Sequence, residues 1–321
     1  SLASDGSAIR ELRVARGIGG FGGAIEAHDA FGSALSTIGD FDGNGVMDLA
    51  VGSPWHSHPQ YREGAVWLLL MNTNGTVASS IKINSGTPGL GTAVFRELGK
   101  SVCSLGDLDS DGTVDLAVGA ENHFGTGSVW ILRLNPDGSA KGFQELRQGI
   151  GGFGSTPYER LGASVSALGD LDGDGVPDLA AGANYPPDFY SSHPLSTVFL
   201  LALRPDGTVK VRRTIDALLP GHAPFDLLGA GLALLGDIDN DGHVDIAAGA
   251  SAREGLTDPG SDHSTLQAAI DASATGDTVL LREGSYVRDD PFFATGSVVG
   301  KGLTIVGDQS WSADGAERFV E

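Results

Sequence analysis

The stretch Gly39-Asp40-Phe41-Asp42-Gly43-Asn44-Gly45-Val46-Met47-Asp48-Leu49-Ala50-Val51-Gly52 decides the fold of this chain. It has an aspartate or asparagine at every second position, then a glycine at a turn, a last aspartate and an apolar run. The pattern returns three more times, in residues 106–116, 169–179 and 236–246. Self-similarity at a fixed period is typical of repeat architectures, so we expect one structural unit repeated along the chain.

A leading glycine precedes every copy and sets the length of the unit. These glycines are Gly32, Gly99, Gly162 and Gly229, with spacings of 67, 63 and 67 residues. Each unit has an alternating strand, the aspartate loop and a second short strand, followed in the first three units by a third apolar strand. The third strands, at 66–70, 129–132 and 198–201, end in Asn-Gly or Asp-Gly pairs, whose residues tolerate the positive φ of a tight hairpin turn. A fourth strand follows.

Four antiparallel strands per unit are the anatomy of a propeller blade. The chain is therefore predicted to be an all-β protein, a β-propeller whose blades stack because one blade cannot bury both faces of its sheet. With 321 residues and 49 glycines, the composition agrees with many tight turns. The formal net charge of −21 argues against nucleic acid or an anionic membrane as partner, since both require a basic surface. No apolar run reaches the roughly 18 residues of a membrane span.

Phe31-Gly32, the aspartate loop and Val51-Gly52-Ser53-Pro54 together resemble the FG-GAP repeat, the blade unit of integrin α-subunit propellers and of many bacterial secreted proteins. Later copies have Leu-Gly in place of Phe-Gly, which changes a packing residue. We assign residues 1–256 to FG-GAP β-propeller repeats. The resemblance implies an extracellular or cell-surface protein with a structural, adhesive or assembly role, and no catalytic residues.

The aspartate loops offer the oxygen ligands of a calcium site. Ca²⁺ takes six to eight oxygens at about 2.3–2.6 Å, and a tight loop can present side chains 1, 3 and 5, carbonyl 7 and carboxylate 9 to one centre. The predicted ligands are Asp40, Asp42, Asn44, the carbonyl of Val46 and Asp48; Asp107, Asp109, Asp111, the carbonyl of Thr113 and Asp115; Asp170, Asp172, Asp174, the carbonyl of Val176 and Asp178; and Asp237, Asp239, Asp241, the carbonyl of His243 and Asp245. About four Ca²⁺ ions are expected, one per loop.

Two alternatives to calcium exist. The loops can be Asp-Gly turns that need no metal, although three or four carboxylates in nine residues repel one another without a cation. Mg²⁺ is the other, but it prefers a rigid octahedron rich in water. Because Asn44 lowers the charge of the first loop by one, we expect that loop to bind calcium least tightly. Calcium would lock the loops and perform no chemistry.

Two further motifs have simpler explanations than a functional site. Residues 17–22 and 149–154, both Gly-Ile-Gly-Gly-Phe-Gly, fit the glycine pattern of dinucleotide-binding loops. Neither opens a helix and both recur at one phase of the repeat, so we expect blade-connecting loops. His56 and His58, with His28 or His123, could in principle bind zinc. Without a cysteine or a partner at fixed spacing, solvated loop histidines are expected instead.

The phase of the repeats at both ends predicts incomplete blades. Residues 5–22 match residues 137–154, so the chain is expected to begin at the fourth strand of a blade. The last unit has its first two strands, while residues 259–263 stand where its third is due. Mismatched ends predict head-to-tail self-association by strand complementation, which would build a filament. The alternatives are a fragment of a longer gene product, or missing strands supplied by residues 264–321.

Residues 257–321 form a second predicted segment. A helical pattern at 264–272 and strands at 276–281 and 301–308 resemble the N-terminal cap and first coil of pectin-lyase-like right-handed parallel β-helices. This resemblance favours an alternative function, an accessory or N-terminal part of a carbohydrate-active, polysaccharide-lyase-like enzyme. The coils that would hold a catalytic groove are not present in the sequence, so the extracellular calcium-binding propeller is the first prediction.

Binding partners are predicted from the variable loops after the second strands, which a propeller gathers on one face. An extracellular protein or glycan could bind there, in addition to self-association. The loops contain the aromatic residues Trp55, Tyr61, Tyr185, Phe189 and Tyr190.

Overall fold

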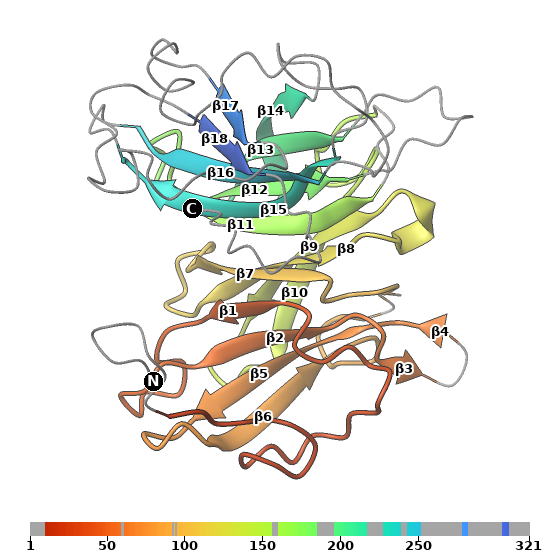
Figure 1. The fold of residues 1–321 in the computed structure, drawn as a ribbon, viewed down its shortest axis with the longest axis vertical. Helices are drawn as coiled ribbons and strands as arrows, with labels where there is room; N and C mark the ends of the chain where they lie inside the picture. The colour runs from red at the N-terminus through yellow and green to blue at the C-terminus, as the bar shows by residue number, and fades with distance from the viewer. Residues whose placement is uncertain are drawn as a thin grey trace, which may run out of the picture.

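The computed structural model consists of antiparallel four-stranded sheets stacked one on another (Figure 1). It describes residues 10–58, 61–91, 93, 95–155, 160–184, 196–216, 227–238, 243–251, 278–281 and 304–307. These residues contain no α-helix, and their single helical turn is the 3-10 segment η1 (His123–Gly125). No helix among them is long and apolar enough to cross a bilayer. The predicted all-β fold of four-stranded blades is confirmed.

The first three units each form one complete sheet, whose strands pair in sequence order. The first sheet contains β1 (Leu35–Thr37), β2 (Leu49–Ser53), β5 (Ala65–Met71) and β6 (Val77–Ile83). The second contains β7 (Ser101–Gly106), β8 (Asp115–Ala120), β9 (Ser128–Leu134) and β10 (Ala140–Leu146). The third contains β11 (Leu161–Gly169), β12 (Asp178–Ala183), β13 (Thr197–Leu203) and β14 (Val209–Asp216).

Shorter pairs complete the described strands. In the fourth unit, β15 (Leu227–Gly236) and β16 (Asp245–Ser251) form the two-stranded sheet that the sequence predicts. A small hairpin of β3 (Ser57–His58) and β4 (Tyr61–Arg62) lies between β2 and β5. In the C-terminal segment, β17 (Thr278–Leu281) and β18 (Thr304–Gly307) pair in parallel, and β18 lies beside β16.

Apolar side chains from both faces of each blade fill the spaces between blades. Along β5, Val66 and Leu68 pack into a core shared with the second sheet, while Trp67 and Leu69 pack on the opposite face against Phe21 and its neighbours. This alternation is what a strand with two covered faces requires. Separate cores lie between the second and third sheets and between the third sheet and β15–β16. The first strands lie side by side, β1 with β7, β7 with β11 and β11 with β15.

Glycines in the second strands allow the blades to approach closely. The Ser101 hydroxyl on β7 donates a 2.9 Å hydrogen bond to the carbonyl of Gly162, the leading glycine of the next unit. A Cβ at Gly119 on β8 would lie 1.9 Å from that same carbonyl oxygen. The contact recurs at 2.0 and 2.1 Å for the pairs Gly52 with Gly99 and Gly182 with Gly229. These glycines therefore set the spacing between blades.

The Gly-Ile-Gly-Gly-Phe-Gly segment at 149–154 connects two blades, as predicted, because it lies between β10 and β11, whereas the same segment at 17–22 precedes β1 and follows no described strand. Both form turns and no helix. In each, a glycine carbonyl accepts a hydrogen bond from the first residue of a fourth strand. The donor and acceptor pairs are Val77 with Gly19 and Val209 with Gly151, both at 2.8 Å. Their phenylalanines, Phe21 and Phe153, are buried in the cores.

The hairpin turns after the third strands differ from the prediction. Only the glycines have positive φ, at +80° for Gly75, +77° for Gly138 and +84° for Gly207. The residue before the glycine closes the turn with its side chain instead. The Asp137 carboxylate accepts from the amide of Ser139 at 2.9 Å and from its hydroxyl at 2.6 Å. The backbone of Asp137 therefore has no need of a left-handed conformation.

The prediction that the chain begins with the fourth strand of a blade is wrong for residues 10–14, the part of that segment that the structure describes. Residues 10–14 lie in no strand, and Ala15 makes only an isolated bridge with Ile18. A fourth strand needs a third strand hydrogen-bonded to it, and no described strand pairs with this segment. The helical pattern at 264–272 and the boundary between residues 256 and 257 lie outside the described residues. The β-helix resemblance and the domain division stay predictions.

Candidate metal centres

Three aspartate loops, residues 40–48, 107–115 and 170–178, join the first strand of a sheet to the second. In each loop the first aspartate accepts a 2.8 Å hydrogen bond from the backbone N–H of the turn glycine. The pairs are Asp40 with Gly45, Asp107 with Gly112 and Asp170 with Gly175. The glycines have φ from +84° to +87°, which L side chains rarely adopt. The loop is therefore wound around its first carboxylate.

The aspartate at position 9 clamps the loop to the third strand. Asp115 is completely buried. Its Oδ1 accepts from the amide of Leu134 at 2.9 Å and its Oδ2 from the amide of Leu108 at 3.1 Å. The equivalent donors are Met71 and Phe41 for Asp48, and Leu203 and Leu171 for Asp178. Spacing alone did not reveal this structural role, which adds to the predicted role as a ligand.

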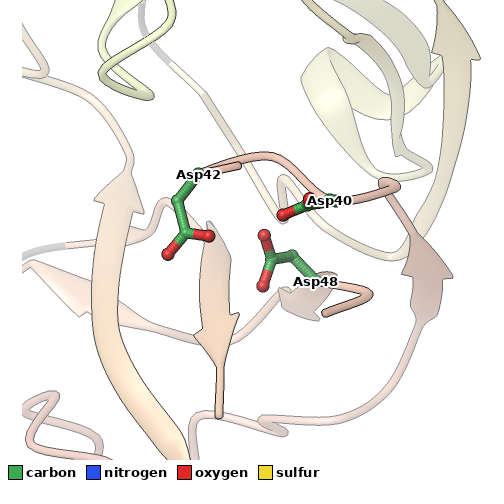
Figure 2. Close-up of side chains that lie close together, drawn as sticks. All are labelled: Asp40, Asp42 and Asp48. Carbon is green, nitrogen blue, oxygen red and sulfur yellow. The ribbon is translucent and has the colours of Figure 1, made fainter. Parts of the chain in front are cut away.

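Carboxylates from positions 1, 3 and 9 meet in all three loops. One ligand oxygen from each lies within 4.8 Å of the other two. The groups are Asp40, Asp42 and Asp48; Asp107, Asp109 and Asp115; and Asp170, Asp172 and Asp178. Figure 2 shows the three carboxylates of the first group gathered at one loop. A cation with ligand distances of about 2.3–2.6 Å can bind oxygens this close together.

The electrostatics of the second and third loops favour a cation. Burial raises the pKa of Asp115 to about 6, and the nearby charges of Asp109 and Asp111 add to the effect. Burial also raises the pKa of Asp178. The Oδ1 atom of Asp109 is buried and has no hydrogen-bond partner. A divalent cation bound by these oxygens would supply the missing partner and offset the cost of burying charge, so these residues fit such an ion.

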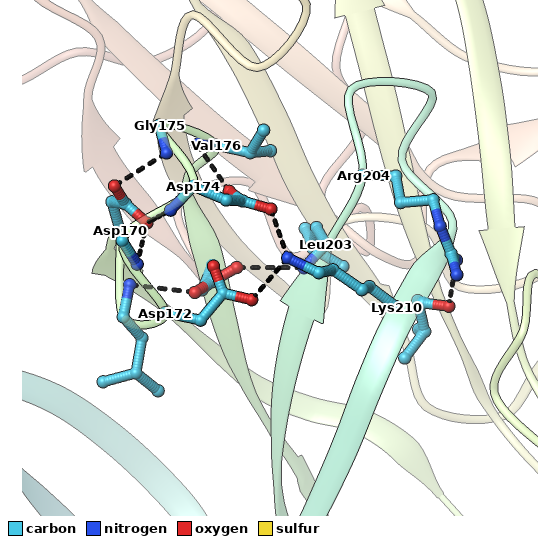
Figure 3. A network of polar contacts seen from close by, with 12 residues as sticks. Asp170, Asp172, Asp174, Gly175, Val176, Leu203, Arg204 and Lys210 are labelled. Carbon is cyan, nitrogen blue, oxygen red and sulfur yellow. Dashed lines mark hydrogen bonds and ion pairs between the residues drawn. The ribbon is translucent and has the colours of Figure 1, made fainter.

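The side chains at position 5 of the loops make hydrogen bonds and ion pairs that the sequence did not predict. Asn44, Asp111 and Asp174 each accept the amide of the residue two positions on, at 2.8–2.9 Å. The second oxygens of Asp111 and Asp174 contact lysines from the fourth strands. Lys210 on β14 donates to Asp172 at 2.8 Å and to Asp174 at 2.6 Å (Figure 3). Lys141 on β10 makes the same two contacts with Asp109 and Asp111, both at 2.7 Å.

The motif pattern did not reveal these lysines, although the aligned repeats contain a signal for them. Each is the second residue of its fourth strand, and the equivalent residue of the first sheet is Ala78. The aligned repeats therefore show a lysine where position 5 is aspartate and an alanine where it is asparagine.

The fourth loop is described only in part. Its last aspartate, Asp245, accepts the amide of Ile238 at 3.0 Å, as its counterparts do in the other loops. Asp239 and Asp241 lie outside the described residues, so the site predicted there stays a prediction. The carbonyls proposed as seventh-position ligands, on Val46, Thr113, Val176 and His243, likewise stay predictions.

Two loop histidines are paired with carboxylates and shielded from solvent, His123 completely and His56 largely, which contradicts the expectation that they are solvated. His56 Nδ1 lies 2.7 Å from Asp29 Oδ2, and His123 Nε2 lies 3.2 Å from Glu145 Oε1. They occupy equivalent positions after β2 and β8, and each ring packs edge-on against the tryptophan of its third strand. Within the described residues, the groups that could hold a metal consist of aspartates alone.

Comparison with known proteins places these loops in a recognised repeat. Residues 31–69 match the FG-GAP repeat, and residues 107–181 match the FG-GAP-like repeat. The chain contains FG-GAP repeats. It is 34% identical to integrin alpha-4 of Xenopus laevis over 155 residues, 48% of this chain and 14% of that protein. Integrin alpha-PS2 of Drosophila melanogaster is 32% identical over 189 residues, 56% of this chain and 12% of that protein.

The chain matches only a small part of each relative's length. Integrin alpha-5 of Xenopus laevis, 33% identical over 165 residues, is covered over 14% of its length. The chain thus spans about one seventh of the curated relatives that it matches.

Proposed function

We propose that this chain is a calcium-binding FG-GAP propeller module that performs no catalysis, with one Ca²⁺ in each aspartate loop. The observation that carries the proposal is the recurrence of one oxygen cluster, from positions 1, 3 and 9, in three separate loops. A cluster that arose by chance from an acidic composition would not repeat at the same positions of the same turn.

Calcium is the ion that suits this set of ligands. All the predicted side-chain ligands offer oxygen, and none is a cysteine or a histidine, because His243 is predicted to bind only through its carbonyl. Calcium accepts variable geometry and several carboxylates, whereas magnesium retains much of its water. The ion would cross-link the start and end of a loop whose last aspartate already holds the third strand. Its role would be to fix the loop at the edge of the blade.

An extracellular or cell-surface setting and an adhesive or assembly role are proposed from the similarity to integrin alpha chains. The proposed partner is an extracellular protein or glycan. Trp55, in the loop after β2, is 45% exposed, with the Arg62 guanidinium 5.1 Å from its ring centroid. The other four aromatic loop residues lie outside the described side chains. Head-to-tail strand complementation stays a prediction, because residues 252–277, directly after β16, lie outside the described residues.

Calorimetric titration of chelator-treated protein with CaCl₂ tests the proposal. We expect heat of binding, about four ions per chain and a rise in Tm. Each site occupied at 100 times its Kd adds about 2.7 kcal/mol to the free energy of unfolding. The variant Asp42→Asn should bind one Ca²⁺ ion more weakly or not at all, because it removes a carboxylate from the first cluster.

The matched control is Asp137→Asn, which alters a hairpin aspartate outside every cluster. It should leave the calcium stoichiometry unchanged. Absence of binding in the wild-type chain, or equal loss of ions in both variants, would contradict the proposal.

A further inference from the structure

Two lysine ammonium groups contact carboxylates that would bind the proposed calcium ions. Lys141 Nζ donates to Oδ2 of Asp109 and of Asp111, and Lys210 Nζ donates to Oδ2 of Asp172 and of Asp174. All four distances fall between 2.6 and 2.8 Å. Both ammonium groups thus bridge positions 3 and 5 of their loops. Their side chains are partly exposed, at 38% and 37%, so each lysine has room to swing into solvent.

The first sheet shows the same position without the lysine. The last third-strand residue pairs with the first fourth-strand residue in all three sheets, as Met71 with Val77, Leu134 with Ala140 and Leu203 with Val209. The next residue is Lys141 in the second sheet, Lys210 in the third and the exposed Ala78 in the first. Ala78 accompanies Asn44, which replaces a carboxylate by a neutral amide.

The aspartate loop, counted together with its lysine where one is present, has the same formal charge in the first three units. The first loop has three aspartates and no lysine, while the second and third loops each have four aspartates and one lysine. The formal charge of loop plus lysine is therefore −3 in all three cases. The expectation that the first loop binds calcium least tightly counted the charges of the loop residues alone. With the lysines included, the three charges are equal and that expectation loses its basis.

We propose that Lys141 and Lys210 are tethered counter-cations that hold the metal-free second and third loops together and that calcium must displace. The inference rests on the proposed calcium binding. A Ca²⁺ ion bound to positions 3 and 5 would share carboxylates with an ammonium group only a few ångströms away. Two cations that close repel each other, so the lysine leaves and its lost contacts reduce the net gain from calcium.

Single variants Lys141→Met and Lys210→Met test the proposal, since methionine keeps an unbranched chain without the charge. In calorimetric titration with CaCl₂, each variant should tighten one binding step about three- to tenfold, the range expected for two partly exposed ion pairs. In chelator, each variant should have a lower Tm than the wild type, because four carboxylates lose their counter-cation. A side chain that serves only for packing would not tighten calcium binding when removed.

The matched control is Lys100→Met, which removes a partly exposed lysine paired with Glu121 at 3.0 Å and with no loop aspartate. It should leave every calcium step unchanged, which separates a local effect from a change in net charge. A reciprocal test uses the first loop. Asn44→Asp should tighten calcium binding there, and adding Ala78→Lys should reverse the gain.

The outcomes distinguish this inference from the proposed function. Calcium binding that is unchanged or weaker in both methionine variants overturns the role of the lysines and leaves the calcium sites standing. A wild-type chain that takes up no calcium overturns both.

Discussion

Asp115 combines two roles that separate variants can distinguish. Its carboxylate accepts two buried backbone amides and also contributes to an oxygen cluster. Asp115→Ala leaves the amides of Leu134 and Leu108 without acceptors. We expect the free energy of unfolding to fall by about 3 kcal/mol in chelator, because each unsatisfied buried group costs about 1–3 kcal/mol and relief of the buried charge offsets part of the loss. Urea denaturation measures this change.

The control for that prediction is Asp42→Ala. The Asp42 carboxylate accepts one exposed amide, that of Asn44. In chelator this variant should therefore lie within about 0.5 kcal/mol of the wild type. With calcium added, it should show a smaller stabilisation than the wild type. Equal destabilisation of the two variants in chelator would show that the buried clamp has no special structural role.

At the scale of single residues, the sequence predicted which carboxylates meet better than it predicted the groups around them. Positions 1, 3 and 9 follow from spacing within a tight turn, and the structure brings them together in three loops. The contacts of Lys141 and Lys210 depend on strands that lie 30 or more residues from the aspartate loops along the chain. The shielding of His56 and His123 from solvent involves packing against Trp67 and Trp130, which a loop sequence alone does not specify.

At the scale of the strand, Gly119 tests how closely two blades must approach. In Gly119→Ala the new Cβ would lie 1.9 Å from the Gly162 oxygen and 2.2 Å from the Ser101 hydroxyl. The neighbouring blade must therefore move, and overpacking of this kind costs about 1–3 kcal/mol or more. We expect Tm to fall by about 5 °C or more in a calorimetric scan.

The matched control for blade spacing is Gly22→Ala. No atom lies within 4 Å of a Cβ built at Gly22, and its φ lies outside the positive range. That variant should melt within about 1 °C of the wild type, because a substitution that meets no neighbour has little effect. If both alanines lowered Tm equally, the contact between β8 and the next blade would not control the packing.

Strands and their order could be predicted because each one repeats. The expected third strands at 66–70, 129–132 and 198–201 fall inside β5, β9 and β13, each of which is two or three residues longer than expected. The prediction failed at 10–14, where the repeat pattern is present but no strand forms. A sequence match specifies which residues suit a strand, whereas a ladder also needs a partner for its backbone groups. The prediction of the hairpin turns after the third strands failed for a related reason. Side-chain hydrogen bonds close these turns, so the residue before the glycine does not need a positive φ.

At the scale of the whole molecule, the charge of −21 predicts how salt and calcium act together. Without divalent ions, the aspartate loops repel one another and their neighbours, which destabilises the compact state. Raising NaCl from about 0.01 M to about 1 M shortens the screening length from about 30 Å to about 3 Å. In chelator we therefore expect Tm to rise with NaCl. Bound calcium neutralises the same carboxylates, so the rise should be smaller when CaCl₂ is present.

Differential scanning calorimetry over an NaCl series, with and without CaCl₂, measures both slopes. Choline chloride is the control, because its large cation screens charge without fitting among the loop oxygens. It should reproduce the rise seen with NaCl in chelator, which separates screening from binding of sodium in the clusters. The double variant Lys141→Met/Lys210→Met should steepen the slope in chelator, since its loops lack their internal cations. Equal slopes with and without calcium would mean that the loop carboxylates are not where the molecule's excess charge is neutralised.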